Sequence, residues 1–181
     1  MRKIALMIGL SLAAVASGAL AQGGPRVHVN IGPALERKAG DYGAEELTVL
    51  RGELGHEVGS ALARNNTPIV SVDLTIEDAN PNRPTMSQMA RTPGLSLSSI
   101  GVGGARLSGV ATFADGHTQP IRYQWFETDI RNEQASGTWT DAERSFMYLA
   151  DDLARGRVPD RFSGPGPSSD GSFGRRVGRG E

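Results

Sequence analysis

Alternation of apolar and polar residues in TPIVSVDLTIED, residues 67–78, constrains the fold more than any other feature of the chain. The polar residues point to one side of the extended segment, and the apolar residues that point to the other are Val70, Val72, Leu74 and Ile76. A period of two over this length is typical of a β-strand with one buried face. The sequence therefore predicts a sheet with one face in the core and the other in water.

A β-hairpin is expected between residues 104 and 129. Asp115-Gly116 is a strong signal for a tight turn, and apolar residues alternate on both arms of the hairpin. Pro120 cannot donate a ladder hydrogen bond, so the second arm is expected at a sheet edge or at a bulge. A further short strand, VHVNI, is expected at residues 27–31.

The first of two expected helices lies within residues 41–66. Apolar residues recur there at helical spacing, namely Leu47, Leu50, Leu54, Val58, Ala61 and Leu62. Three glycines of this segment each cost up to ~1 kcal/mol inside a helix, which favours close packing of the helix against a sheet; they are Gly52, Gly55 and Gly59.

The second helix is expected to begin at Thr140, where Thr140 and Glu143 form a capping box, and to end at Gly156. Taken together, the segments predict a single α+β domain over residues 22–158, with a small, largely antiparallel sheet packed against two helices on one face. From residue 159 to residue 181 the chain is rich in glycine, proline, serine and arginine. Such a segment buries too little apolar surface to offset the entropy of ordering, so we expect a disordered tail.

Residues 1–21 have the pattern of a secretory signal peptide. Arg2 and Lys3 precede a short apolar run, and Ala19-Leu20-Ala21 forms an A-x-A cleavage site, so the mature chain is expected to begin at Gln22. No later segment is apolar enough to span a membrane. The pattern indicates a protein that is exported and, after cleavage, soluble in the periplasm of a Gram-negative bacterium.

The counts of cysteines and charged residues narrow the classes of function. The chain has 0 cysteines, so neither disulfides nor a lipoprotein-type anchor are available. Without its first 21 residues it keeps 17 basic and 20 acidic residues, a formal charge of −3. This balance argues against a nucleic-acid partner, which normally requires a basic surface.

The connection between residues 78 and 104 is unusually long for a compact domain, and such loops tend to be functional or mobile. Its asparagine-proline end is stiff, and its middle carries methionines that either line a groove or pack down on the sheet as a flap. The candidate ligand-binding or partner-binding residues are Asn80, Asn82, Arg83, Met86, Gln88, Arg91 and, just beyond the loop, Arg106.

Other chemistries find little support in the sequence. The glycines at 101, 103 and 104 are followed by a predicted strand rather than a helix, and no lysine is near, so a nucleotide-binding loop is not indicated. His28, His56 and His117 have no metal-ligand spacing, and no serine lies in a G-x-S-x-G elbow. We therefore predict no catalytic residue, no metal and no cofactor.

The order of a helix, VSVDLTIEDANPNRP, GVGGA, an ADG hairpin and a closing ADDLARG helix covers residues 44–156. In this layout the chain resembles small uncharacterised α/β envelope proteins and lipoproteins of proteobacteria. It departs from the lipoproteins because it lacks their lipid-anchored cysteine. The resemblance implies an α/β envelope domain, and it transfers no catalytic residue.

These observations lead to two hypotheses about function. The first is a non-enzymatic periplasmic binding or envelope-assembly protein, whose partner is an envelope protein or a cell-wall component. The alternative is a small periplasmic hydrolase or other enzyme with a site on the 78–104 loop. The sequence does not determine the oligomeric state.

Overall fold

The computed structural model describes residues 24–133 and 137–167. Helices and strands follow one another in the order given by their bounds: β1 (Arg26–Ile31), α1 (Pro33–Arg37), α2 (Ala39–Tyr42), α3 (Ala44–Arg64), β2 (Ile69–Asn80), α4 (Met86–Arg91), β3 (Gly104–Phe113), β4 (Thr118–Phe126), the 3-10 helix η1 (Ile130–Glu133) and α5 (Thr140–Ala154). The predicted strands and the two long helices are confirmed. The four short helices were not anticipated.

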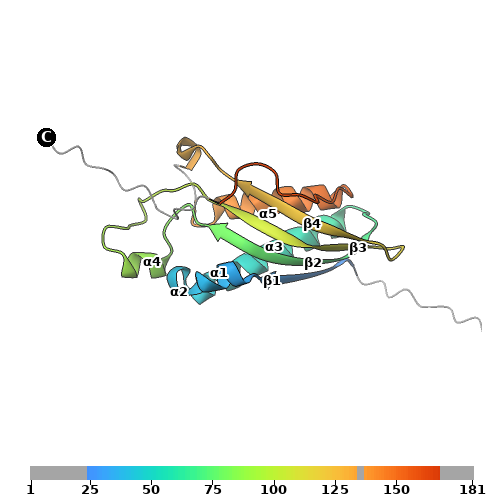
Figure 1. Cartoon of the computed structure of the whole chain (residues 1–181), viewed down its shortest axis with the longest axis horizontal. Coiled ribbons are helices and arrows are strands. Elements are labelled where there is room, and N and C mark those ends of the chain that lie inside the picture. Colours follow the sequence, from blue (N-terminus) through green and yellow to red (C-terminus); the bar gives the residue numbers. More distant parts are fainter. Residues whose placement is uncertain (1–23, 134–136, 168–181) are drawn as a thin grey trace, which may run out of the picture.

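The four strands form one sheet in the order β1-β2-β3-β4, and α3 and α5 cover one of its faces (Figure 1). β2, β3 and β4 pair in antiparallel fashion, and β1 runs parallel to β2. The parallel pair follows from α3, which carries the chain back along the sheet before β2 begins. The predicted α+β class is thus confirmed, with a mixed sheet in which two of the three pairings are antiparallel.

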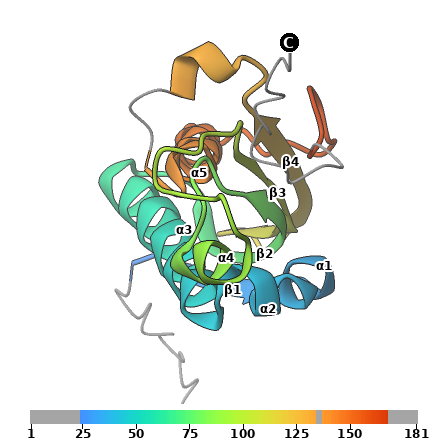
Figure 2. The ribbon, with the colours of Figure 1, turned by 90° about the vertical axis from the view of Figure 1, so that its left-hand side faces the viewer.

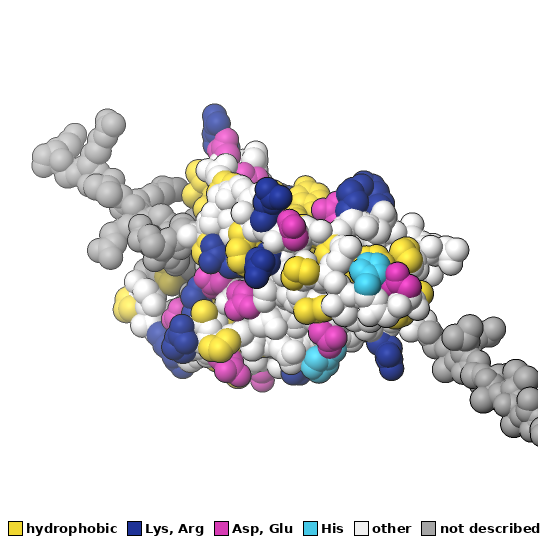
Figure 3. Space-filling view, turned by 45° about the vertical axis from the view of Figure 1, so that its right-hand side comes forward, with side chains coloured by type: hydrophobic (Ala, Val, Ile, Leu, Met, Phe, Trp, Pro, Cys, Tyr) yellow, Lys and Arg dark blue, Asp and Glu magenta, His cyan; other side chains and the backbone are white. Residues whose placement is uncertain are grey.

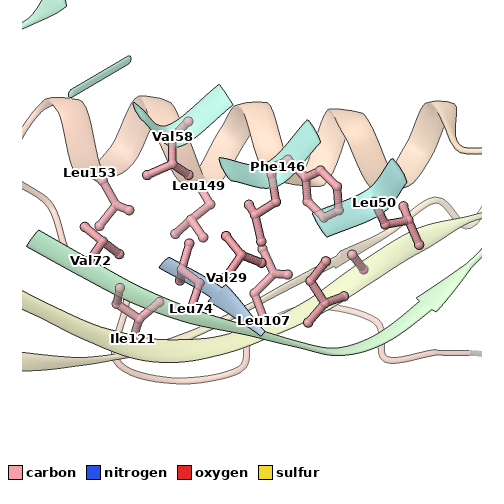
Figure 4. Close-up of a cluster of buried hydrophobic side chains, with 14 of the residues drawn as sticks. Val29, Leu50, Val58, Val72, Leu74, Leu107, Ile121, Phe146, Leu149 and Leu153 are labelled. Atoms are coloured by element: carbon pink, nitrogen blue, oxygen red, sulfur yellow. The ribbon is translucent and has the colours of Figure 1, made fainter. Parts of the chain in front are cut away.

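The core lies between the sheet and the two long helices. Apolar side chains from both layers meet there, as the close-up shows for Leu74 and Leu107 from the strands and Leu50, Phe146 and Leu149 from the helices (Figure 4). All five are 0 or 1% exposed. Burial of this apolar surface is the main stabilising contribution to a fold that has no disulfide.

The opposite face of the sheet carries polar side chains at the alternate positions. Asp73 and Arg122 are exposed there, and Thr75 and Ser108 are half-buried. Figure 3 shows that charged, polar and apolar side chains are interspersed over the visible side of the molecule. This alternation is the one expected for a half-open sheet.

The structure corrects two details of the predicted elements. A register shift between Ile69 and Ser71 turns Val70 outward, so Ile69 is buried in its place and Val70 is 40% exposed. α5 does begin at Thr140, but its cap residue is Trp139 and no capping box forms, because the Thr140 hydroxyl accepts a hydrogen bond from the Gly137 amide at 2.8 Å.

The glycines of α3 are not explained by close packing against the sheet. A Cβ on Gly55 or Gly59 would meet Val29 or Val27 at 3.7 or 3.9 Å, which is ordinary van der Waals contact. A Cβ on Gly52 would meet nothing within 4 Å. The helix therefore has room for alanine at all three positions.

The chain beyond α5 follows β4. The Arg122 amide donates a hydrogen bond to the Pro159 carbonyl at 2.8 Å, and the Gln124 side chain donates to the Gly164 carbonyl at 2.9 Å. The Arg106 guanidinium lies over the ring of Phe162, 5.1 Å from its centre. Residues 159–167 make these contacts although their composition predicted disorder, and residues 168–181 lie outside the described residues.

The expected signal peptide, residues 1–21, also lies outside the described residues. Within residues 24–133 and 137–167, no helix is long and apolar enough to cross a membrane.

Candidate functional site

The segment between β2 and β3, residues 81–103, forms one end of the molecule. It carries α4 and stands at the end of the long axis, beyond the strands (Figure 1). In the view along the strands, α4 lies in front of the sheet and beside α2 (Figure 2). We call this segment the β2–β3 loop.

A buried asparagine fixes the start of this loop. Both carboxylates of Glu133 and Asp141 accept hydrogen bonds from the Asn82 amide nitrogen at 2.5 Å, and the Asn82 side-chain oxygen accepts one from the Asp141 amide at 2.9 Å. The Asn82 backbone bonds to Thr138 and Gly101. One residue thus joins the loop to η1, to the start of α5 and to the far end of the loop itself.

The same cluster also holds the end of the loop. The second oxygen of Asp141 bonds to Arg144 at 2.9 Å, and the oxygen shared with Asn82 also accepts from the Gly103 amide at 2.9 Å. Asn82, Glu133 and Asp141 are all 0% exposed. The two carboxylates are thus shielded from solvent, and their hydrogen bonds to Asn82 and Gly103 hold both ends of the loop.

Glycine is required where the loop enters β3. A Cβ on Gly103 would lie 2.6 Å from the Asn82 side-chain oxygen, and one on Gly104 would lie 2.3 Å from the Trp125 carbonyl oxygen. Gly104 also has a φ of +145°, which side chains disfavour. These glycines allow two backbones to approach, as expected for the start of a strand, and they do not form an anion cradle.

A second anchor holds α4. The Thr85 and Gln88 side chains form a capping box, and the Gln88 amide also donates to Asp41 at 3.2 Å. The Arg91 guanidinium donates to the Gly40 carbonyl. α4 is therefore fastened to α2 through Gln88 and through its last residue, Arg91.

α2 is in turn held against the end of β2. The Tyr42 hydroxyl donates to the Ala79 carbonyl at 3.3 Å, and Lys38 pairs with Asp78 at 2.6 Å. Burial, followed by the negative charges of Asp78 and Asp41, raises the pKa of Tyr42 well above its ordinary value. The hydroxyl thus stays protonated and remains a donor at every physiological pH.

The anchored loop nevertheless exposes large apolar side chains. Met86 is 72% exposed and Leu97 is 65% exposed, more than any other large apolar residue in the described part of the chain. Met89 and Leu95 are half-buried. Met86 thus stands open, whereas Met89 and Leu95 are partly covered on a loop whose helix packs against α2.

The predicted site residues therefore fall into groups with different surroundings. Asn80, Asn82 and Gln88 are buried inside the fold. Arg83 donates to the Leu97 carbonyl at 2.8 Å and ties the two halves of the loop together. Met86 is 72% exposed and is the apolar member of the predicted set that is open to a partner.

Arg91 and Arg106 complete the predicted set, and they lie in different places. Arg91 is exposed beside α2, at the loop. Arg106 lies on the outer face of β3, where it bonds to Gln124 at 2.9 Å and contacts Phe162. The structure thus places Arg106 away from the α4 contacts.

The sequence did not reveal Glu133, Asp141 or the exposure of Leu97. Glu133 and Asp141 lie 51 and 59 positions from the Asn82 that they contact, and a contact over that distance leaves no local pattern. The available signal was weak, consisting of two acidic residues around a Gly-Thr-Trp segment.

The three histidines of the chain are all exposed. His117 pairs with Asp115 at 2.5 Å and stacks on Phe113 at the exposed hairpin turn. His28 and His56 are exposed on β1 and α3. In residues 24–133 and 137–167, no group of three or more histidine, cysteine or acidic side chains could hold a metal ion.

No protein-family model, curated protein or solved structure matches this chain.

Proposed function

We propose that this chain is a non-enzymatic binding protein of the bacterial periplasm, and that its β2–β3 loop is the contact surface. The observation that carries the proposal is the exposure of Met86 and Leu97 on a loop that is anchored by buried hydrogen bonds. A contiguous apolar patch on an ordered surface is typical of an interaction site, and these two side chains belong to the same ordered loop.

The anchors make binding favourable, because a loop that is already ordered loses little entropy when a partner arrives. Asn82 fixes the chain that leads into α4 and Gln88 fixes α4 itself, while Met86 occupies the first helical position and faces solvent. The buried polar residues thus keep the loop ordered, and the exposed apolar residues make the contact with the partner.

Site-specific photo-cross-linking in the periplasm tests the proposal. A cross-linking residue in place of the exposed Ser98 should give discrete adducts, whereas one in place of Glu45 on α3 should not. Combining Met86→Ser with Leu97→Ser should abolish the adducts without unfolding the protein, since both side chains face solvent.

Val49→Ser is the matched control, because Val49 is 50% exposed but lies on α3. Adducts that survive the double serine variant, or that vanish equally with Val49→Ser, would show that the loop is not the contact surface.

Export is part of the proposal and rests on the signal-like residues 1–21. Intact-mass analysis of the protein from a periplasmic fraction should give a chain that begins at Gln22. Ala21→Arg should block cleavage and retain the precursor. A periplasmic chain that keeps Met1, or a wild-type chain confined to the cytoplasm, would contradict this part of the proposal.

A further inference from the structure

The sheet has one edge that no described segment covers. β4 is bordered by the chain after α5, whereas β1, at the lower border of the sheet in Figure 1, pairs only with β2 among the described residues. The Gly32 amide donates to the Ile76 carbonyl at 2.9 Å. Because alternate residues of a parallel strand bond to the same neighbour, the main-chain groups of Val27, Val29 and Ile31 point to the free side.

α3 forms a wall of small residues beside this edge. A Cβ on Gly55 or Gly59 would contact Val29 or Val27, so this flank of the helix lies against β1. Gly52 continues the same flank toward the start of α3, where it is exposed and a Cβ would meet nothing within 4 Å. The edge and the wall together form a groove with unpaired main-chain groups along it, and the glycines leave space beside those groups.

A crevice lies at the end of this groove. It is bounded by the end of α3 and by the residues before β1 and β2, and its lining includes Pro25, Leu62, Ala63 and Ile69. Ala63 follows Gly59 by one turn on the same flank and is exposed. The groove therefore leads into a partly apolar recess, which suits an apolar side chain of an extended segment.

From these features we infer that the β1 edge binds an extended peptide segment of another protein, which adds to the sheet as a further strand. Recognition of this kind takes its affinity from main-chain hydrogen bonds and its specificity from alternate side chains. The peptide side chains on the core side lie beside the glycines of α3 and are expected to be apolar. The site is separate from the β2–β3 loop, so the inference goes beyond the proposed function and does not rest on it.

A second copy of this chain fits the edge less well than a peptide. α3 contacts β1 more closely than any other strand, so two β1 strands paired antiparallel across a two-fold axis would bring two α3 helices together on one face. Neighbouring strands lie about 4.8 Å apart, whereas packed helices need about 8–10 Å between their axes. An extended segment with no helix above it avoids this conflict.

The outer face of β1 adds a small preference in charge. Arg26 and His28 are exposed and point to that face, since the side chains of a strand alternate. Asp73 lies opposite His28 and offsets part of this charge, whereas Arg26 lies opposite the neutral Ser71. We therefore expect glutamate to be favoured over lysine in the peptide beside Arg26.

Fluorescence anisotropy tests the inference, with the chain from Gln22 onward so that the apolar residues 4–15 cannot compete for the groove. The probe is a labelled peptide of alternating valine and glutamate with the length of β1, and it should bind saturably. Two control peptides carry N-methyl groups, one on all valines and the other on all glutamates. Only one of these two sets of amides faces β1, so one control should bind at least about ten-fold more weakly and the other should bind like the probe.

Variants of the protein locate the site. Val27→Pro removes an amide that points away from β2, a position where an edge strand tolerates proline, and it should weaken binding about five-fold or more. Gly52→Leu should obstruct the groove and abolish binding. Glu53→Leu is its matched control, because Glu53 is the exposed neighbour on the side toward Glu143 of α5, and it should change nothing.

Charge variants test the preference at Arg26. Arg26→Gln should weaken binding by up to about five-fold, and a probe with lysine in place of glutamate should bind more weakly than the original. Arg64→Gln is the matched control, since Arg64 is also exposed but lies on α3.

The inference is overturned if the probe does not bind, if the two methylated peptides bind equally, or if Gly52→Leu binds like the wild type. A dimer of the free protein that dissociates in Val27→Pro, measured by light scattering, would assign the edge to a second copy and would also overturn it. The double variant of Met86→Ser and Leu97→Ser should bind the probe unchanged. This result separates the β1 edge from the β2–β3 loop, and loss of binding in that variant would contradict the inference.

Discussion

At the scale of single residues, the fold concentrates several long-range constraints on one asparagine side chain. Asn82 donates to one oxygen of each of two carboxylates that are 0% exposed, Glu133 and Asp141. Polar groups in such surroundings are tolerated only when hydrogen bonds meet them. The cluster therefore fixes the β2–β3 loop in one position, and the loss of any one of its hydrogen bonds should be strongly destabilising.

Asn82→Ala should destabilise the protein by about 3 kcal/mol or more, because two buried carboxylates each lose a donor. The measurement is urea denaturation, together with hydrogen exchange over residues 81–103, which should accelerate. Asn80→Ala is the matched control, since Asn80 is also buried but its side chain accepts only a long 3.4 Å hydrogen bond from Lys38. Equal losses in the two variants would contradict the role assigned to Asn82.

Gly52→Ala should have the opposite effect. Alanine is favoured over glycine in a helix interior by about 1 kcal/mol, and a Cβ at Gly52 meets nothing within 4 Å. The free energy of unfolding should rise by up to that amount. Gly109→Ala is the contrasting variant, because its Cβ would lie 2.1 Å from the Asp73 carbonyl oxygen and should destabilise the sheet. A loss of stability in Gly52→Ala would contradict the expectation that a methyl group is accommodated at this position.

At the scale of elements, what could be predicted depended on whether a segment buries one face. β2, β3, β4, α3 and α5 each do so, and their apolar periods reveal them. The short helices α1, α2 and α4 have at most one buried residue each, so they leave no period to recognise. The apolar pattern of β2 also did not predict that Val70 turns outward. A bulge is set by the pairing with β3 and not by the strand's own sequence.

The contact between α3 and α5 predicts a dependence of stability on pH. Desolvation of the carboxylate against the neighbouring helix, and then the charge of Glu53, raises the pKa of Glu143 above its ordinary value. The folded state therefore disfavours the ionised carboxylate, and this penalty is absent at low pH but present once the pH exceeds the raised pKa. Glu143→Gln should stabilise the protein at neutral pH and should lose that advantage below about pH 4.5.

Thermal unfolding of the wild type and Glu143→Gln across this range is the measurement. The gain is modest, because the side chain is exposed and solvent screens it. Glu53→Gln should act in the same direction, and the double variant should gain less than the sum of the two. Glu45→Gln, at the first turn of α3, is the control and should not stabilise, since it removes a charge that favours the helix dipole. A pH-independent gain in Glu143→Gln would argue against the ionisation.

At the scale of the whole molecule, the sequence determined the layers better than the site. Two layers follow from a sheet with one apolar face and two helices with one apolar stripe each, and all of these are visible as local patterns. The anchors of the loop leave no such local pattern, because Asn82, Glu133 and Asp141 meet only after the chain has folded. The sequence therefore located the candidate loop by its length and its turn residues, while only the structure separated its anchors from its exposed side chains.

One edge strand of the sheet, β4, is covered by the chain that follows α5, and this predicts the consequence of shortening the chain. β4 is covered by the chain that follows α5, because the Arg122 amide donates to the Pro159 carbonyl and Gln124 donates to Gly164. Uncovered edge strands invite pairing with other chains. A chain that ends after Val158 should therefore exchange the Arg122 amide faster and should associate at high concentration, whereas one that ends after residue 167 should keep both properties of the full chain.

Hydrogen exchange and light scattering measure these two effects, and the comparison of the two truncations isolates residues 159–167 from the rest of the tail. Phe162→Ala in the full chain separates two causes, since it removes the contact with Arg106 but leaves the backbone bond to Pro159. If covering the edge is what matters, Phe162→Ala should resemble the full chain. If it instead resembles the chain that ends after Val158, the Arg106 contact holds the segment in place, and the edge is protected only as a consequence.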